Sequence, residues 1–95
     1  MISLDTVQHK TFAPLVGHCF VTGEVRLELT GVRKLGHKRA DAPRDPFSLT
    51  FRGAKELRLP QGIYRSECDG LDEIEFFISQ FAAGSAGSEF EAIFN

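Results

Sequence analysis

The stretch PFSLTFRGAKELRLPQGIYRSEC, residues 46–68, is the part of the sequence that decides the fold. Every second residue of its first half is large and apolar, at Phe47, Leu49 and Phe51, and the residues between them are polar. This period of two is typical of a half-buried β-strand. The proline and glycine of LPQG, residues 59–62, favour a type II turn. The stretch therefore predicts a β-hairpin with one apolar face that other segments must cover.

Four more segments have the alternation of strands, at His18–Thr22, Glu24–Leu35, Glu73–Phe81 and Glu89–Asn95. The alternation shifts by one residue at Gly31, which is typical of a β-bulge. Before the first strand, residues 7–16 are expected to form a short helical segment, with Asp5 and Thr6 as its capping residues. About six strands and one short N-terminal helix predict an all-β fold, either a small antiparallel β-barrel or a two-sheet sandwich. The length of 95 residues fits a single domain over residues 1–95.

The core is expected to consist mainly of phenylalanine, because the chain has nine Phe, one Tyr and no Trp. The strand phases predict that five Phe are buried, namely Phe47, Phe51, Phe76, Phe90 and Phe94. This many rings predicts a filled barrel interior. Phe77 and Phe81 fall on the opposite face of their strand, and we expect the N-terminal helix, with Phe12 and Leu15, to cover them.

Composition places the chain among ordinary globular proteins, with 42% hydrophobic and 25% charged residues. Its apolar runs are too short to span a membrane, and its first residues, MISLDTVQHK, do not read as a secretion signal. We therefore expect a cytoplasmic protein without membrane association. In that reducing compartment Cys19 and Cys68 should remain unpaired thiols.

The net charge of −2 conceals a segregation of charge along the chain. Residues 26–65 hold ten Lys or Arg against four acids, and the residues after Arg65 hold seven acids and no base. We hypothesise a basic surface around residues 33–44 and an acidic surface around residues 67–75. The candidate partner-binding residues are Arg33, Lys34, Lys38, Arg39 and Arg44. The basic stretch lacks aromatic residues for stacking on bases, and the whole chain is acidic, so we expect no nucleic-acid partner.

Motifs of catalysis, of metal binding and of cofactor binding do not occur. The three histidines, His9, His18 and His37, have no HxH or HxxxH spacing, and no CxxC is present. His18 and Cys19 are adjacent on a predicted strand, so their side chains should point to opposite faces and form no dyad. Acid pairs such as Asp72 with Glu73 and Glu89 with Glu91 could mimic a carboxylate dyad or a calcium loop, but Glu89 and Glu91 alternate with core residues, which is typical of a solvated face. No cofactor, metal or catalytic residue is predicted.

Four segments together resemble a bacterial family of small all-β proteins classed as a domain of unknown function. They are TFAPLVG at 11–17, APRDPFSLTFRG at 42–53, LPQGIY at 59–64 and FEAIFN at 90–95. Genes of that family are often found beside those of phage-tail-collar-type proteins. The resemblance therefore implies an accessory or structural role in such an assembly, and it carries no catalytic residue to this chain.

These observations favour a noncatalytic structural or protein-interaction module that binds a protein partner or itself. The alternative is a small-ligand-binding β-barrel, which would need a cavity where the Phe rings are expected. An uncharacterised enzyme is the third interpretation.

Overall fold

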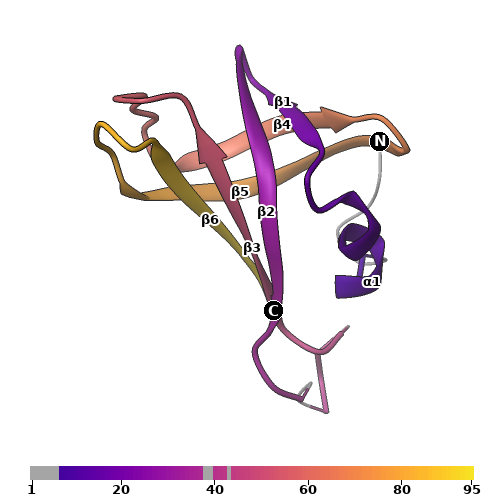
Figure 1. Ribbon diagram of the computed structural model, residues 1–95. Coiled ribbons are helices and arrows are strands. Elements are labelled where there is room, and N and C mark those ends of the chain that lie inside the picture. The colour runs from indigo at the N-terminus through magenta and orange to yellow at the C-terminus, as the bar shows by residue number, and fades with distance from the viewer. Residues whose placement is uncertain (1–6, 38–39, 43) are drawn as a thin grey trace.

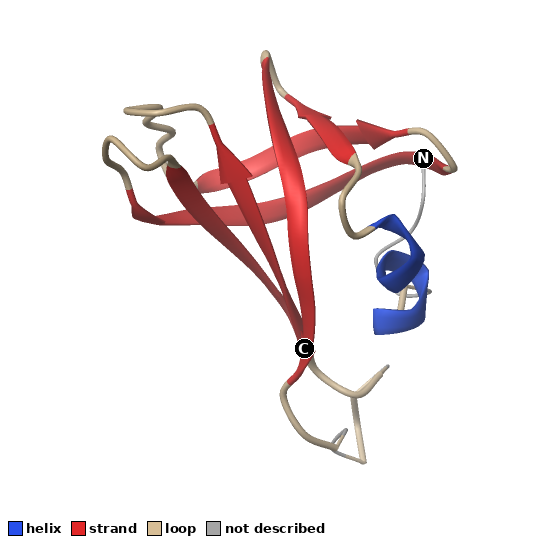
Figure 2. Cartoon of the chain, viewed as in Figure 1, coloured by secondary structure: helices blue, strands red, loops and turns tan. Residues whose placement is uncertain are grey.

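The computed structural model describes residues 7–37, 40–42 and 44–95 of the chain. Its strands are β1 Cys19–Thr22, β2 Val25–Lys34, β3 Phe47–Gly53, β4 Gly62–Cys68, β5 Leu71–Ala82 and β6 Ser88–Phe94. They pair antiparallel and close into a barrel in the order β1-β2-β3-β6-β5-β4 (Figure 1). Strands dominate the chain, and the helical residues precede β1 (Figure 2). The all-β prediction is confirmed, and the barrel is the form that the chain adopts.

The barrel interior is filled by aromatic and aliphatic side chains from all six strands. On the inner face β3 and β6 place Phe47 opposite Phe94 and Phe51 opposite Phe90. The ring of Phe51 also stacks on that of Phe76, with centroids 6.0 Å apart. All five Phe predicted to be buried are at most 4% exposed, so the predicted strand phases are confirmed there.

The predicted hairpin between the two central strands is wrong. Both strands exist, but β3 pairs with β2 and β6, whereas β4 pairs with β1 and β5. The expected type II turn is also absent from this described stretch, since neither Gln61 nor Gly62 has a positive φ and Gly62 begins β4. The physical reason is that β6 offers β3 a row of inward Phe and Ala residues, which pack against the inward Phe and Leu residues of β3.

The connection between β3 and β4 closes one end of the barrel instead of forming a tight turn. Ser88 Oγ lies 2.7 Å from the carbonyl oxygens of both Ala54 and Leu57, and its hydroxyl can donate a hydrogen bond to either of them. Gln80 Nε2 donates to the Leu57 carbonyl at 2.7 Å, and Gln80 Oε1 accepts from the Leu59 backbone N–H at 2.8 Å. These contacts hold the connection against the β5–β6 hairpin.

The β-bulge predicted at Gly31 is confirmed. The register of β2 against β3 shifts between Leu29 and Gly31, so that Val32 returns to the inner face beside Leu49. A Cβ at Gly31 would lie 3.1 Å from Thr50 Oγ1, which explains why the smallest residue stands at this bend.

The N-terminal helical segment consists of α1, His9–Phe12, and a 3₁₀ turn at Ala13–Leu15. The helix begins after Gln8, whose backbone N–H donates to Thr11 Oγ1 at 3.1 Å. The predicted capping residues Asp5 and Thr6 lie outside the described residues.

The expectation that this helix covers Phe77 and Phe81 is wrong, because both side chains are more than half exposed. Phe12 turns inward instead, with ring centroids 5.9 Å from Phe47 and 5.6 Å from Phe94. The ladder between β5 and β6 extends only from Ser79 to Ala82 on β5, and beyond it the two strands diverge (Figure 1). The helix fills the end that this divergence opens, because Phe12 loses more contact with water there than on an outer face.

Adjacent residues of β5 test the core directly. Phe76 is 3% exposed and Phe77 is 51% exposed, so Phe76→Ala should lower the free energy of unfolding by about 3 to 5 kcal/mol. Phe77→Ala, the matched control, should lower it by about 1 kcal/mol or less, since it removes only a cross-strand pair. Urea unfolding followed by circular dichroism measures both. Equal losses would mean that the faces of β5 are assigned wrongly.

Gly53 tests the closed end of the barrel. A Cβ there would lie 2.8 Å from Leu57 Cδ2, 2.9 Å from Leu27 Cδ2 and 3.2 Å from Phe90 Cε1. Gly53→Ala should therefore cost about 1 to 3 kcal/mol through overpacking. Gly62→Ala is the control, because its Cβ would meet nothing within 4 Å. A thermal melt in which the two variants unfold alike would contradict the packing of Leu57 over this end.

Candidate functional site

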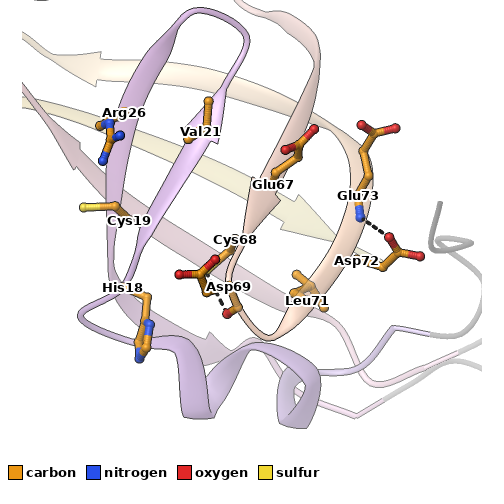
Figure 3. Close-up of a pocket in the computed structure, with 10 residues that line it drawn as sticks. All are labelled: His18, Cys19, Val21, Arg26, Glu67, Cys68, Asp69, Leu71, Asp72 and Glu73. Carbon is orange, nitrogen blue, oxygen red and sulfur yellow. Dashed lines mark hydrogen bonds between the residues drawn. The ribbon is translucent and has the colours of Figure 1, made fainter.

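An open cavity of about 570 Å³ lies on the outer surface between β1 and the β4–β5 hairpin (Figure 3). Its floor and walls come from β1, β2, β4, β5 and the hairpin turn. The turn is built on Gly70, whose φ of 87° places it in the left-handed region that glycine adopts freely. The lining residues are His18, Cys19, Val21, Arg26, Glu67, Cys68, Asp69, Leu71, Asp72 and Glu73.

Four carboxylates make the lining of this cavity acidic, and Figure 3 shows them along the hairpin that forms one side. They are Glu67, Asp69, Asp72 and Glu73. The Arg65 guanidinium lies 3.4 Å from Glu73 and 3.8 Å from Glu75, so part of the negative charge is compensated. The hypothesised acidic surface around residues 67–75 is therefore assembled in the fold. Within the described residues, no group of three or more His, Cys, Asp or Glu could hold a metal ion.

The two thiols of the cavity lie on opposite faces of the sheet. Cys19 is exposed, Cys68 is buried, and both are free, as predicted. Cys68 Sγ donates to the Asp69 carbonyl oxygen at 3.5 Å. Burial raises the pKa of the Cys68 thiol, and the nearby Asp69 and Cys19 raise it further. Cys68 is therefore a protonated, unreactive thiol at neutral pH.

His18 and Cys19 do not form a nucleophile and base pair. The imidazole of His18 and the sulfur of Cys19 point in different directions in Figure 3. This agrees with the prediction drawn from strand geometry. The cavity thus joins carboxylates to a basic side chain and two thiols without the nucleophile–base contact that acyl transfer needs.

The structure separates the basic candidate residues that the sequence grouped together. Arg33 lies on the outer face of β2, opposite Ser48, and Lys34 is exposed at the end of the same strand. Arg44 is only 8% exposed, and its Nη1 donates to the Asn95 carbonyl oxygen at 2.8 Å, so this residue adds little to the hypothesised basic surface. The charge of the guanidinium is used to hold two distant segments together. Lys38 and Arg39 lie outside the described residues.

A second surface feature escaped the sequence analysis. The outer faces of β4, β5 and β6 carry four exposed apolar side chains, which we call the apolar face: Ile63, Phe77, Phe81 and Ile93, between 51% and 71% exposed. Ile63 is directly opposite Phe77 in the β4–β5 ladder. The sequence placed Phe77 and Phe81 outside the core, but it could not show that Ile63 of another strand lies opposite Phe77.

Comparison with known proteins identifies the family. A family model described as a domain of unknown function (DUF6916) matches residues 7–94, so the chain belongs to this family. This agrees with the resemblance to a domain-of-unknown-function family. No curated protein and no solved structure matches the chain. In the part of the chain that the structure describes, no helix has the length and apolar character needed to cross a membrane.

The thiols give a chemical test of the cavity. At pH 8, iodoacetamide should modify Cys19 at least roughly tenfold faster than Cys68, because Cys68 is buried and its raised pKa keeps it protonated. Peptide mass spectrometry over a time course gives both rates. In denaturant both thiols of the non-reduced protein should react at similar rates. Rapid modification of Cys68 in the folded protein would contradict its burial, and a missing thiol would contradict the free state.

Proposed function

We propose that this DUF6916 domain is a noncatalytic protein-interaction module that binds a protein partner, or a second copy of itself, through its outer surface. The apolar face carries this proposal. Two Phe and two Ile stand exposed on three neighbouring strands, in a domain whose interior is already filled by other side chains.

The surroundings of the apolar face have the composition of an interface rim. Arg65 and Glu75 form an ion pair beside it, Glu91 lies next to Ser79, and Arg33 stands two strands beyond Ile93 in the same row. Interfaces typically combine an apolar centre with a polar, solvated rim. Exposed apolar side chains that lie side by side, as Ile63 and Phe77 do, are typical of a binding surface.

The noncatalytic part of the proposal rests on the side chains of the cavity between β1 and the β4–β5 hairpin. Its buried thiol is protonated, and its histidine and exposed thiol diverge. A small-ligand-binding barrel is the alternative, but Phe12, Phe20, Phe51 and Phe90 occupy the interior that a ligand would need. The cavities described on this chain lie on its outer surface, and an uncharacterised enzyme remains the third interpretation.

The resemblance of the sequence supports a finer form of the proposal. We place the protein in the bacterial cytoplasm as an accessory to a phage-tail-collar-like assembly, in which it binds another protein component. The free state of both thiols agrees with a reducing compartment. Nucleic acid, membranes and small-molecule cofactors have no part in this proposal.

Charge would guide the encounter with that partner. The carboxylates around the cavity and the cations Arg33 and Lys34 lie on different parts of the barrel, so each can attract a surface of opposite sign. The charges steer association, and the apolar face supplies the area that keeps the complex together.

Pull-down from the native host, with mass spectrometry of the captured proteins, tests the apolar face. The wild-type chain should capture a partner that Phe77→Thr and Ile93→Thr lose. Threonine keeps the strand propensity while removing most of the apolar area. Leu35→Thr is the matched control, because Leu35 is 46% exposed and outside the apolar face. Equal capture by all variants would contradict the proposal.

The charge contribution is tested on the recovered complex. Arg33→Glu with Lys34→Glu should slow association, and the wild-type rate should fall as salt rises from about 0.05 to 0.5 M, because screening shortens the range of steering. The dissociation rate should change little. Surface plasmon resonance separates the two rates. If neither salt nor the charge reversal changes the association rate, Arg33 and Lys34 do not take part in binding.

A further inference from the structure

We infer that one edge of β5 binds an extended segment of a partner protein as an added β-strand, and that this segment carries an apolar and a basic residue two positions apart. The inference rests on the proposed function and names how the partner meets the surface around Phe77. It is carried by the backbone groups of Glu75 and Phe77, which point away from β4 and pair with no other strand in the described chain.

A hydrogen bond on the neighbouring strand fixes the direction of these backbone groups. The Gly23 N–H donates to the Arg65 carbonyl oxygen at 3.0 Å, so Arg65 of β4 turns its backbone groups toward β1. Residues of an antiparallel strand turn their N–H and C=O groups to alternate sides. Tyr64 and Ser66, on either side of Arg65, therefore form the hydrogen-bonded pairs with β5.

The same alternation continues on β5. Phe76 is opposite Tyr64, so it turns its backbone groups toward β4. Its neighbours Glu75 and Phe77 consequently turn their N–H and C=O groups to the opposite edge of the strand. Ser79, two residues further along, turns to the same side and pairs there with β6, which agrees with this direction.

This edge of β5 is open between Glu73 and Ser79. The ladder with β6 begins at Ser79, and toward the β4–β5 hairpin the two strands diverge (Figure 1). The helix α1 and the 3₁₀ turn pack against β2. Among the described residues, none forms a backbone hydrogen bond with Glu75 or Phe77 on this side. The Glu73 N–H donates to Asp72 Oδ1 at 2.9 Å, so the open edge ends there.

An extended segment is the partner that fits an open strand edge. Its own N–H and C=O groups complement those of Glu75 and Phe77, which is how proteins bind peptides by strand addition. Side chains of neighbouring strands share a face, so the residues opposite Glu75 and Phe77 would point outward and the residue between them inward. The inner face there is filled, because Phe76 is 3% exposed and its ring centroid is 5.7 Å from that of Phe94. The inward residue must therefore be small.

The outward side chains of β5 select the outward residues of the segment. Phe77 is 51% exposed and has Ile63 opposite it on β4, so an apolar residue on its other side would cover the ring. Glu73 and Glu75 share one guanidinium, that of Arg65, at 3.4 Å and 3.8 Å. One negative charge therefore remains, and a basic residue beside Glu75 would compensate it.

The acetylated and amidated peptide Ser-Val-Ser-Lys-Thr tests the inference without knowledge of the natural partner. Paired antiparallel with β5, it places valine beside Phe77 and lysine beside Glu75. NMR titration of the isotope-labelled chain should give a dissociation constant on the order of 1 mM. The amides of Glu75 and Phe77 should exchange with solvent more slowly in the bound form, because they gain hydrogen-bond acceptors.

Methylation of the peptide nitrogens tests the backbone pairing without changing the protein. Methyl groups on the valine and lysine nitrogens should abolish binding, because these two N–H groups face β5. Methyl groups on the two serine nitrogens are the matched control and should leave most of the binding.

Glu75→Pro and Glu75→Ala make the same distinction on the protein. Both remove the carboxylate, but only proline removes the N–H on the open edge. Proline is tolerated in a strand where its nitrogen does not face a ladder, so the pairing with β4 should persist, and circular dichroism checks the fold. Glu75→Pro should abolish peptide binding, and Glu75→Ala should only weaken it.

Three results would overturn the inference. They are no peptide binding at about 5 mM, equal loss of binding with either pair of methyl groups, and a free chain that dimerises through this edge, which would make the occupant a second copy. If a host protein is captured through Phe77 but the peptide does not bind, the proposed function stands and strand addition does not. If the peptide binds as described and no host protein is captured, the edge binds strands and the proposed partner is what fails.

Discussion

The stacked rings of Phe47 and Phe94, with centroids 4.7 Å apart and planes within 4°, join the two strands on which closure of the barrel depends. These strands, β3 and β6, are far apart in the chain, and their pairing carries the sheet across from its first half to its second. Phe12 packs on both rings, so the N-terminal helix is fixed by the same contact. Loss of the three rings of Phe12, Phe47 and Phe94 would weaken both the pairing of β3 with β6 and the covered end of the barrel.

A filled interior determines where this protein can act. The described core residues occupy the barrel from the Phe12 end to the Leu57 end, and the proposed function therefore uses the outer surface. That surface has two features of different physical character. The cavity beside the β4–β5 hairpin is open and rich in carboxylates, and the residues of the apolar face on β4, β5 and β6 are exposed. Carboxylates act at long range and weaken with salt, whereas apolar area acts only on contact.

Arg44 and Cys68 show how burial changes the role of a reactive or charged group. Arg44 belongs to the basic stretch of the sequence, yet its guanidinium binds the Asn95 carbonyl oxygen and joins the loop after β2 to the end of β6. Cys68 lies beside an exposed thiol and several carboxylates, yet its position on the inner face keeps it protonated. Residue type alone suggests that an arginine and a cysteine bind or react at the surface, but both of these residues are buried and stabilise the fold.

The sequence by itself determined the strands, the bulge at Gly31 and the five buried Phe, because alternation and glycine placement are local properties that each segment expresses alone. It did not determine which strands pair. The stretch at residues 46–68 reads as a hairpin, but Phe47 finds a better apolar partner in Phe94, and only the closed barrel brings that residue near. The same holds for the surfaces. Phe77 could be seen to lie outside the core, but the apolar residue opposite it, Ile63, comes from β4. Only tertiary structure decides which residues of distant strands meet, because that choice depends on the total area buried over the whole molecule.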